Sequence, residues 1–220
     1  MKEKTTAIVL AAGQGKRMHS KIQKQFLEIQ GHPVLYYSLK CFQESPLIHD
    51  IIIVTGEDMI SYCKREIVER YQLTKVSAVI AGGKERYDSV YKGLLACEEC
   101  KYVFIHDGAR PYVNKESIDD LVECLKDYSA GLLMVPCKDT IKEVKDGIVV
   151  KTLKRETLMQ AQTPQVFKSE DIKIAYQKAK DEGFVATDDS QLFERYINKE
   201  IKVVLGDYGN LKITTQEDLK

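Results

Sequence analysis

Residues 6–18 read T-A-I-V-L-A-A-G-Q-G-K-R-M, an apolar run that passes into a glycine-containing turn. Such a run, bounded by turn residues, is typical of a buried β-strand. Similar runs recur at residues 50–55, 76–80, 102–106 and 132–135. Segments with helical periodicity lie between them, at residues 33–44, 59–71, 88–98 and 115–128. Strands that alternate with helices predict an α/β fold with a doubly wound, mostly parallel, Rossmann-like sheet.

The size of the chain predicts one domain over residues 1–220. With 220 residues, of which 44% are hydrophobic and 30% charged, the chain can bury one large core. Around Lys145-Asp146-Gly147 the alternation of strands and helices gives way to a β-hairpin pattern. We therefore expect a protruding β-arm at about residues 138–156.

Charge and hydropathy argue against two classes of partner. Lys plus Arg equals Asp plus Glu at 33 each, so no excess of positive charge indicates a nucleic acid. The apolar runs are far shorter than the roughly 20 residues that span a bilayer, and no signal-peptide pattern opens the chain. We expect a cytoplasmic protein that binds neither nucleic acid nor membrane.

The six cysteines are too scattered for the disulfide framework of a secreted protein, and we expect them to be reduced. Cys97 and Cys100 form a C-x-x-C pair, but this pair lies at the end of a run that is predicted as helix. It also lacks the second pair of ligands that a zinc site needs. We interpret Cys97 and Cys100 as ordinary thiols.

The turn after the first strand is rich in positive charge. Four cationic side chains and no carboxylate lie between Gly13 and Lys24. Glycines let successive backbone N–H groups approach an anion, and clustered cations repel one another unless an anion compensates them. The turn therefore predicts a polyphosphate site.

Met18 stands where a dinucleotide-binding G-x-G-x-x-G needs its third glycine, and no Walker sequence can be drawn. A nicotinamide-dependent oxidoreductase is thus disfavoured but stays open, as does a non-catalytic nucleotide-binding protein.

Six motifs follow one another along the chain. They are A-A-G-Q-G-K-R-M at 11–18 with K-Q-F at 24–26, H-D-G-A-R-P at 106–111, D-T-I-K at 139–142, Q-T-P-Q at 162–165, T-D-D at 187–189 and N-L-K-I-T at 210–214. Together they resemble the 2-C-methyl-D-erythritol 4-phosphate cytidylyltransferase family over residues 6–219. Ribitol-5-phosphate cytidylyltransferases share the first loop and the T-P-Q segment, so the acceptor alcohol stays open between the two. The D-T-I-K and T-D-D motifs favour the first family.

The resemblance implies that a cytidylyl group passes from CTP to methylerythritol phosphate and that pyrophosphate leaves. A phosphate is already nucleophilic at neutral pH, so this reaction needs alignment of two polyanions and neutralisation of charge rather than a base. We expect Arg17, Lys24 and Lys212 to supply that charge. We interpret His106 as a structural histidine.

The resemblance also implies binding residues. CTP is expected to contact Ala11, Ala12, Gly13, Gly15, Gly83 and Ser89. The acceptor is expected to contact Asp107, Arg110, Thr140, Arg155 and Thr187. Mg²⁺ is expected mainly on the substrate phosphates, with Asp107 as the nearest candidate ligand. In the family the arms of two subunits clasp each other, which implies a homodimer in which Thr140 and Arg155 reach the neighbour's acceptor site.

Overall fold

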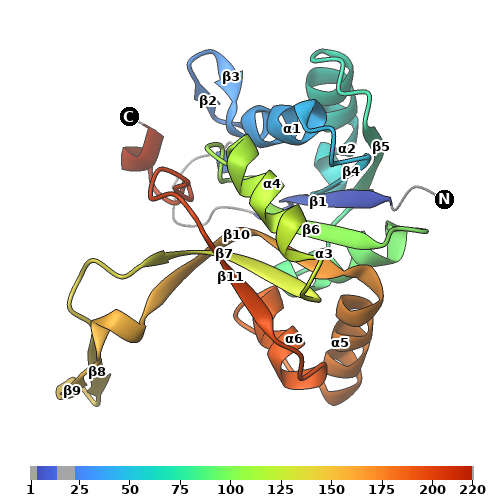
Figure 1. Ribbon diagram of the computed structural model, residues 1–220. Helices are drawn as coiled ribbons and strands as arrows, with labels where there is room; N and C mark the ends of the chain where they lie inside the picture. Colours follow the sequence, from blue (N-terminus) through green and yellow to red (C-terminus); the bar gives the residue numbers. More distant parts are fainter. Residues whose placement is uncertain (1–3, 14–22, 220) are drawn as a thin grey trace.

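A seven-stranded sheet forms the centre of the computed structural model, which describes residues 4–13 and 23–219 (Figure 1). Its strands are β1 (Thr5–Ala11), β4 (Asp50–Thr55), β5 (Val76–Ala81), β6 (Tyr102–Asp107), β7 (Ala130–Pro136), β10 (Met159–Lys168) and β11 (Ile201–Leu205). They lie in the order β11-β7-β10-β6-β1-β4-β5. Every pairing is parallel except the two that β10 makes with β6 and β7. The predicted α/β fold with a mostly parallel sheet is confirmed.

Helices cover both faces of this sheet (Figure 1). On one face lie α1 (Val34–Glu44), the short α2 (Ile60–Tyr62) with its π-helical continuation η4 (Cys63–Glu69), and α4 (Lys115–Cys124). On the other face lie α3 (Arg86–Ala96), α5 (Ser169–Glu182) and α6 (Asp189–Tyr196). Smaller elements are η2 (Lys24–Phe26), the ladder of β2 (Glu28–Ile29) with β3 (His32–Pro33), η3 (Glu57–Met59) and η6 (Gln216–Leu219).

Two layers of side chains fill the space between the sheet and its helices. All six residues of β4 are buried, as a parallel strand covered on both faces requires. Phe42 of α1 packs edge to face on Phe104 of β6, with ring centroids 6.4 Å apart. Full burial of such side chains stabilises the fold by about 1.5–3 kcal/mol each. Within the described residues, no helix combines the length and the apolar character needed to cross a bilayer.

The strand β10 was not predicted, although it lies in the middle of the sheet. It carries Gln162, Thr163 and Pro164, which are typical of a loop rather than of a central strand. The structure accommodates them with a shift in register against β7 between Ala161 and Gln165, and the Thr163–Pro164 peptide is cis. Because of this irregularity, Pro164 does not interrupt a regular ladder.

The interpretation of Cys97 and Cys100 as thiols was wrong, since the structure joins them in a disulfide. The predicted helix ends earlier than expected, at Ala96, so both cysteines lie in the loop before β6. Their Cα atoms are 6.4 Å apart, within the usual range for a disulfide.

The predicted hairpin is present as an arm that projects away from the sheet (Figure 1). It consists of β8 (Lys142–Lys145) and β9 (Ile148–Thr152), followed by the turn η5 (Arg155–Thr157). Asp146 and Gly147 both have positive φ, at 51° and 78°, as a two-residue hairpin turn requires. Every residue of β8 and β9 is exposed, including Val144 and Ile148.

Candidate active site

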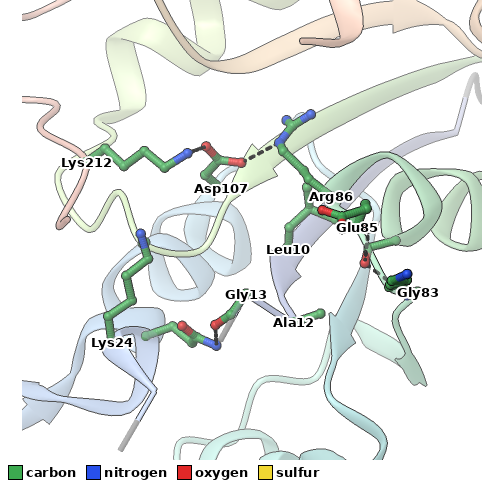
Figure 2. Close-up of a pocket in the computed structure, with 13 residues that line it drawn as sticks. Leu10, Ala12, Gly13, Lys24, Gly83, Glu85, Arg86, Asp107 and Lys212 are labelled. Carbon is green, nitrogen blue, oxygen red and sulfur yellow. Dashed lines mark hydrogen bonds and ion pairs between the residues drawn. The ribbon is translucent and has the colours of Figure 1, made fainter. Parts of the chain in front are cut away.

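A cavity of about 600 Å³ lies at the carboxyl ends of β1, β5 and β6. Ligands of open α/β sheets bind at this edge. Seven of the sequence-predicted site residues line the cavity, namely Ala12, Gly13, Lys24, Gly83, Ser89, Asp107 and Lys212. In Figure 2 the two lysines lie on one side of the cavity and Gly83 lies on the other. The fold thus brings together residues that are far apart in the sequence.

Lys24 opens the short turn η2, and its position depends on its two buried neighbours. The Gln25 side-chain amide donates hydrogen bonds to the carbonyl oxygens of Ala11 and Gly13, the latter at 3.1 Å. Phe26 packs edge to face on Tyr62, with ring centroids 5.4 Å apart. The hydrogen bonds of Gln25 fasten η2 to the end of β1, and Phe26 packs it against α2. Lys24 is thereby held at the rim of the cavity.

Gly83 lies opposite the lysines, where only glycine fits. A Cβ atom at this position would lie 2.1 Å from Cβ of Asp88 and 3.1 Å from its carbonyl carbon. The Gly83 N–H donates a 3.0 Å hydrogen bond to Oγ of Ser89, and that hydroxyl donates to the Glu85 carbonyl oxygen. The loop after β5 is therefore packed against the first turn of α3, and backbone atoms form this wall of the cavity.

Asp107 ends β6 between two cations (Figure 2). Its Oδ1 accepts a 3.0 Å hydrogen bond from Nε of Arg86, and its Oδ2 accepts a 2.6 Å hydrogen bond from Nζ of Lys212. Burial alone would raise the pKa of Asp107, but the attraction of Arg86 and Lys212 outweighs it and holds this pKa well below its usual range. The carboxylate is therefore ionised at neutral pH.

Lys212 lies in the irregular segment after β11 rather than on a strand. The Ile213 N–H donates a 2.8 Å hydrogen bond to the carbonyl oxygen of Ala109. Arg110 donates from NH1 to the carbonyl oxygen of Asn210, at 2.7 Å. The segment is thus tied to the loop after β6 on both sides of Lys212, which keeps the ammonium beside Asp107.

His106 is fully buried and joins the two ends of the loop that carries Asp107. Its Nδ1 accepts from the Thr163 hydroxyl at 3.2 Å, and its Nε2 donates to the Arg110 carbonyl oxygen at 3.1 Å. The same hydroxyl oxygen accepts the Asp107 N–H. Burial lowers the pKa of His106 to about 4, so the ring is neutral at neutral pH. Its contacts fit the structural role that the sequence analysis assigned to it.

This lowered pKa predicts an acid-dependent loss of stability. Between pH 6.5 and pH 4 the unfolded chain binds a proton on His106 that the folded chain does not bind, so the stabilisation present above pH 6.5 is lost as the pH falls. We expect the free energy of unfolding to fall by about 3 kcal/mol over this range because of His106. Urea denaturation at pH 7.0, 5.5 and 4.5 measures the effect.

The control for this prediction compares two histidine variants. His106→Asn is expected to be less stable at pH 7 but to have a shallower dependence on pH than the unchanged chain. His49→Asn alters an exposed histidine and should retain the part of the dependence that His106 causes. Equal pH dependence in His106→Asn and the unchanged chain would contradict the prediction.

Several predicted site residues do not line the cavity. The Ala11 side chain is buried in the core, and Arg110 is folded against Asn210. Thr187 is exposed before α6 and pairs with Gln191. The remaining two lie on or beside the exposed arm, namely Thr140 and Arg155. The predicted residues Gly15 and Arg17 lie outside the described part of the chain.

The donors that face the cavity do not favour a metal ion held by protein ligands. Among residues 4–13 and 23–219, no group of three or more His, Cys, Asp or Glu side chains is placed to hold one. Both oxygens of Asp107 already contact cationic side chains. A divalent cation on Asp107 would have to displace at least one of these cations.

Comparison with known proteins identifies the family. A family model described as 2-C-methyl-D-erythritol 4-phosphate cytidylyltransferase matches residues 5–220. The chain belongs to this family. A 2-C-methyl-D-erythritol 4-phosphate cytidylyltransferase of Lachnospira eligens is 47% identical over 98% of this chain and 96% of its own length. One of Geotalea uraniireducens is 45% identical over 98% of this chain and 94% of its own length.

Solved structures of the family share the fold. The 4-diphosphocytidyl-2C-methyl-D-erythritol synthase of Anaerococcus prevotii superposes with a TM-score of 0.87 at 33% identity, covering 99% of this chain and 95% of its own. The 2-C-methyl-D-erythritol 4-phosphate cytidylyltransferase of Francisella tularensis superposes with a TM-score of 0.82 at 32% identity, covering 98% and 96%. These matches do not favour a nicotinamide-dependent oxidoreductase or a non-catalytic nucleotide-binding protein.

Sequence reasoning missed three residues that organise the cavity, namely Gln25, Arg86 and Asp189. Gln25 lies within the K-Q-F motif, between a cation and an aromatic residue, and only its burial shows that it anchors the turn. Arg86 and Asp189 stand at the first positions of α3 and α6. A positive charge at a helix start opposes the helix dipole, and this local conflict was the available signal for Arg86.

Proposed function

We propose that the chain transfers the cytidylyl group of CTP to 2-C-methyl-D-erythritol 4-phosphate, with release of pyrophosphate. The observation that carries this proposal is the cavity itself, in which Gly13 after β1, the Gly83 loop, Asp107, Lys24 and Lys212 meet. Its volume of about 600 Å³ suits a small-molecule ligand. The family of the chain supplies the identity of both substrates.

The proposed reaction joins two anions, and the residues of the cavity suit that task. An oxygen of the acceptor phosphate attacks the α-phosphorus of CTP, and the bond from this phosphorus to the bridging oxygen of pyrophosphate breaks. The incoming phosphate needs no base, so the protein has to align the reactants and offset their negative charge. We assign Lys24 and Lys212 to that role, and Arg17 as well on the resemblance of its motif.

We propose that the wall formed by Ala12, Gly83 and Ser89 binds the cytosine end of CTP. A Cβ at Gly82 would lie 2.6 Å from that of Ala12, so these two loops are already in close contact. A wall made of backbone and small side chains can exclude a larger purine by steric contact. Gly13 would then lie along the triphosphate, and Ala11 would support the end of β1 from the core. We assign Gly15 to CTP on the resemblance of its motif alone.

Magnesium is proposed to enter with the nucleotide. Mg²⁺ retains water ligands and is commonly held by substrate phosphates with few protein carboxylates. Since both oxygens of Asp107 contact cations, the triphosphate is the better source of ligands. When bound, the ion would offset part of the charge on the phosphates. Asp107 would keep both cations and accept a hydrogen bond from a hydroxyl of the acceptor on a remaining lone pair.

We propose that two copies of the chain share each site through their arms. Each copy would act as one cytidylyltransferase domain over residues 1–220, in the cytoplasm. The apolar side chains of the hairpin support an interface, because Val144, Ile148, Val149 and Val150 are each more than half exposed. Thr140 and Arg155 of one copy would contact the acceptor phosphate bound to the other copy. Arg110 and Thr187 of that other copy would complete its acceptor site.

An assay of pyrophosphate release tests the proposed reaction. With CTP and Mg²⁺ present, we expect turnover with methylerythritol phosphate and much slower turnover with ribitol 5-phosphate. Replacing CTP by ATP should abolish turnover, since a purine does not fit the proposed base site. Preferential turnover of ribitol phosphate, or no turnover of either acceptor by folded protein, would contradict the proposal.

A further inference from the structure

Asp189, at the start of α6, is fully buried although it carries a charge. Its Oδ1 accepts from NH1 of Arg86 at 3.0 Å, and its Oδ2 accepts from NH2 at 2.8 Å. The Tyr176 hydroxyl donates a further hydrogen bond to Oδ1. A buried charge is tolerated when it is paired and hydrogen-bonded, and Asp189 meets both conditions.

The guanidinium of Arg86 binds two carboxylates through different nitrogen atoms. NH1 and NH2 are directed at Asp189, while Nε is directed at Asp107. Because this group is planar and its donors are fixed in direction, the orientation imposed by Asp189 determines where Nε points. The second oxygen of Asp107 in turn holds Nζ of Lys212 (Figure 2).

We infer that Asp189 is a positioning residue for cytidylyl transfer: by fixing Arg86 it orients the Asp107 carboxylate and, through that carboxylate, the Lys212 ammonium. This inference rests on the proposed function. It also explains why Asp107 holds its two cations one on each oxygen, since both terminal nitrogens of Arg86 are engaged elsewhere. Without Asp189, those two nitrogens would compete with Lys212 for Asp107.

Removing the charge of Asp189 should therefore rearrange the side chains of the cavity, although Asp189 itself does not line it. In Asp189→Asn the guanidinium has lost its bidentate carboxylate, and Asp107 is the other carboxylate that it contacts. Asp107 is expected to rotate toward NH1 or NH2 and to release Lys212. Displacement of a catalytic group by about 1 Å can cost about 10²-fold in rate, and we expect a loss of kcat of that order.

A double-mutant cycle separates positioning from a purely structural role. We would measure kcat and KM, per folded protein, for the unchanged chain, Asp189→Asn, Asp107→Asn and the combined variant. If Asp189 acts through Asp107, its loss should lower kcat strongly in the unchanged background and by less than about twofold once Asp107 is replaced. An effect of equal size in both backgrounds would overturn the inference, and so would an unchanged kcat.

A milder variant covers the case in which Asp189→Asn does not fold. Tyr176→Phe removes the hydrogen bond that the Tyr176 hydroxyl donates to Asp189. It retains the ion pair of Asp189 with Arg86 and the stacking on Tyr87, whose ring centroid is 5.0 Å away. We expect a loss of kcat of about threefold to tenfold, which again disappears in the Asp107→Asn background. A loss that persists in that background would overturn the inference.

Asp171→Asn is the matched control. Asp171 is a largely buried carboxylate of α5, the helix that also carries Tyr176. Its Oδ2 lies 2.8 Å from Nζ of Lys199, and neither residue lines the cavity. Its loss should leave kcat unchanged. An unchanged chain that transfers no cytidylyl group would overturn the proposed function and this inference together, whereas an active chain with an unaffected Asp189→Asn variant would overturn the inference alone.

Discussion

Lys24→Ala is expected to lower kcat for cytidylyl transfer by about 10²–10³ while the chain remains folded. Lys24 lies at the rim of the cavity, on the turn that Gln25 fastens to the end of β1. Negative charge shifts onto the departing pyrophosphate as the reaction proceeds, and a fixed ammonium stabilises that state more than the bound substrates. The loss should therefore appear in kcat, measured by pyrophosphate release at saturating CTP.

The opposite outcome would identify Lys24 as an ordinary surface lysine. In that case its replacement changes the stability by less than about 0.5 kcal/mol and leaves turnover unaffected. Lys126→Ala is the matched control, because Lys126 is an exposed lysine beyond the end of α4 that pairs with Glu123. Thermal unfolding of both variants shows whether a loss of rate comes from loss of folded protein.

The sequence predicted the strands of the sheet well wherever packing dictated their composition. A parallel strand that is covered on both faces has to be apolar throughout, and β4 was predicted with its observed bounds for this reason. The failure at β10 has the same origin. Part of β10 is polar because Gln162 and Gln165 make hydrogen bonds to distant loops, and such contacts leave no periodic pattern in the sequence.

The candidate site could be predicted where a local motif carries the chemistry, but not where partners come from separate elements. The glycine turn and the K-Q-F motif pointed to Lys24, and the family resemblance pointed to Asp107 and Lys212. The pairing of Arg86 with Asp189 joins residues 103 positions apart, through two helix starts that face each other only in the folded chain. No pattern of spacing records that contact.

Arg155→Ala is expected to abolish most activity when every subunit carries it, and to regain activity when mixed with Lys24→Ala subunits. Arg155 is exposed, donates to the Lys138 carbonyl oxygen at 2.9 Å and lies outside the cavity of its own subunit. The arm carries it away from the sheet (Figure 1). If it binds the acceptor phosphate of a second copy, one site of each mixed dimer has both Lys24 and Arg155 intact.

The size of the recovery follows from counting sites. Random exchange makes about half of the dimers mixed, each with one intact site of two, so the mixture should regain about a quarter of the unchanged activity. A second mixture, Lys24→Ala with Lys212→Ala, should regain none, because both lysines line the cavity of one subunit and every site lacks one of them. Differently tagged subunits and native mass spectrometry would establish that mixed dimers are present. If such dimers form and the Lys24→Ala with Arg155→Ala mixture stays inactive, Arg155 does not act across the interface.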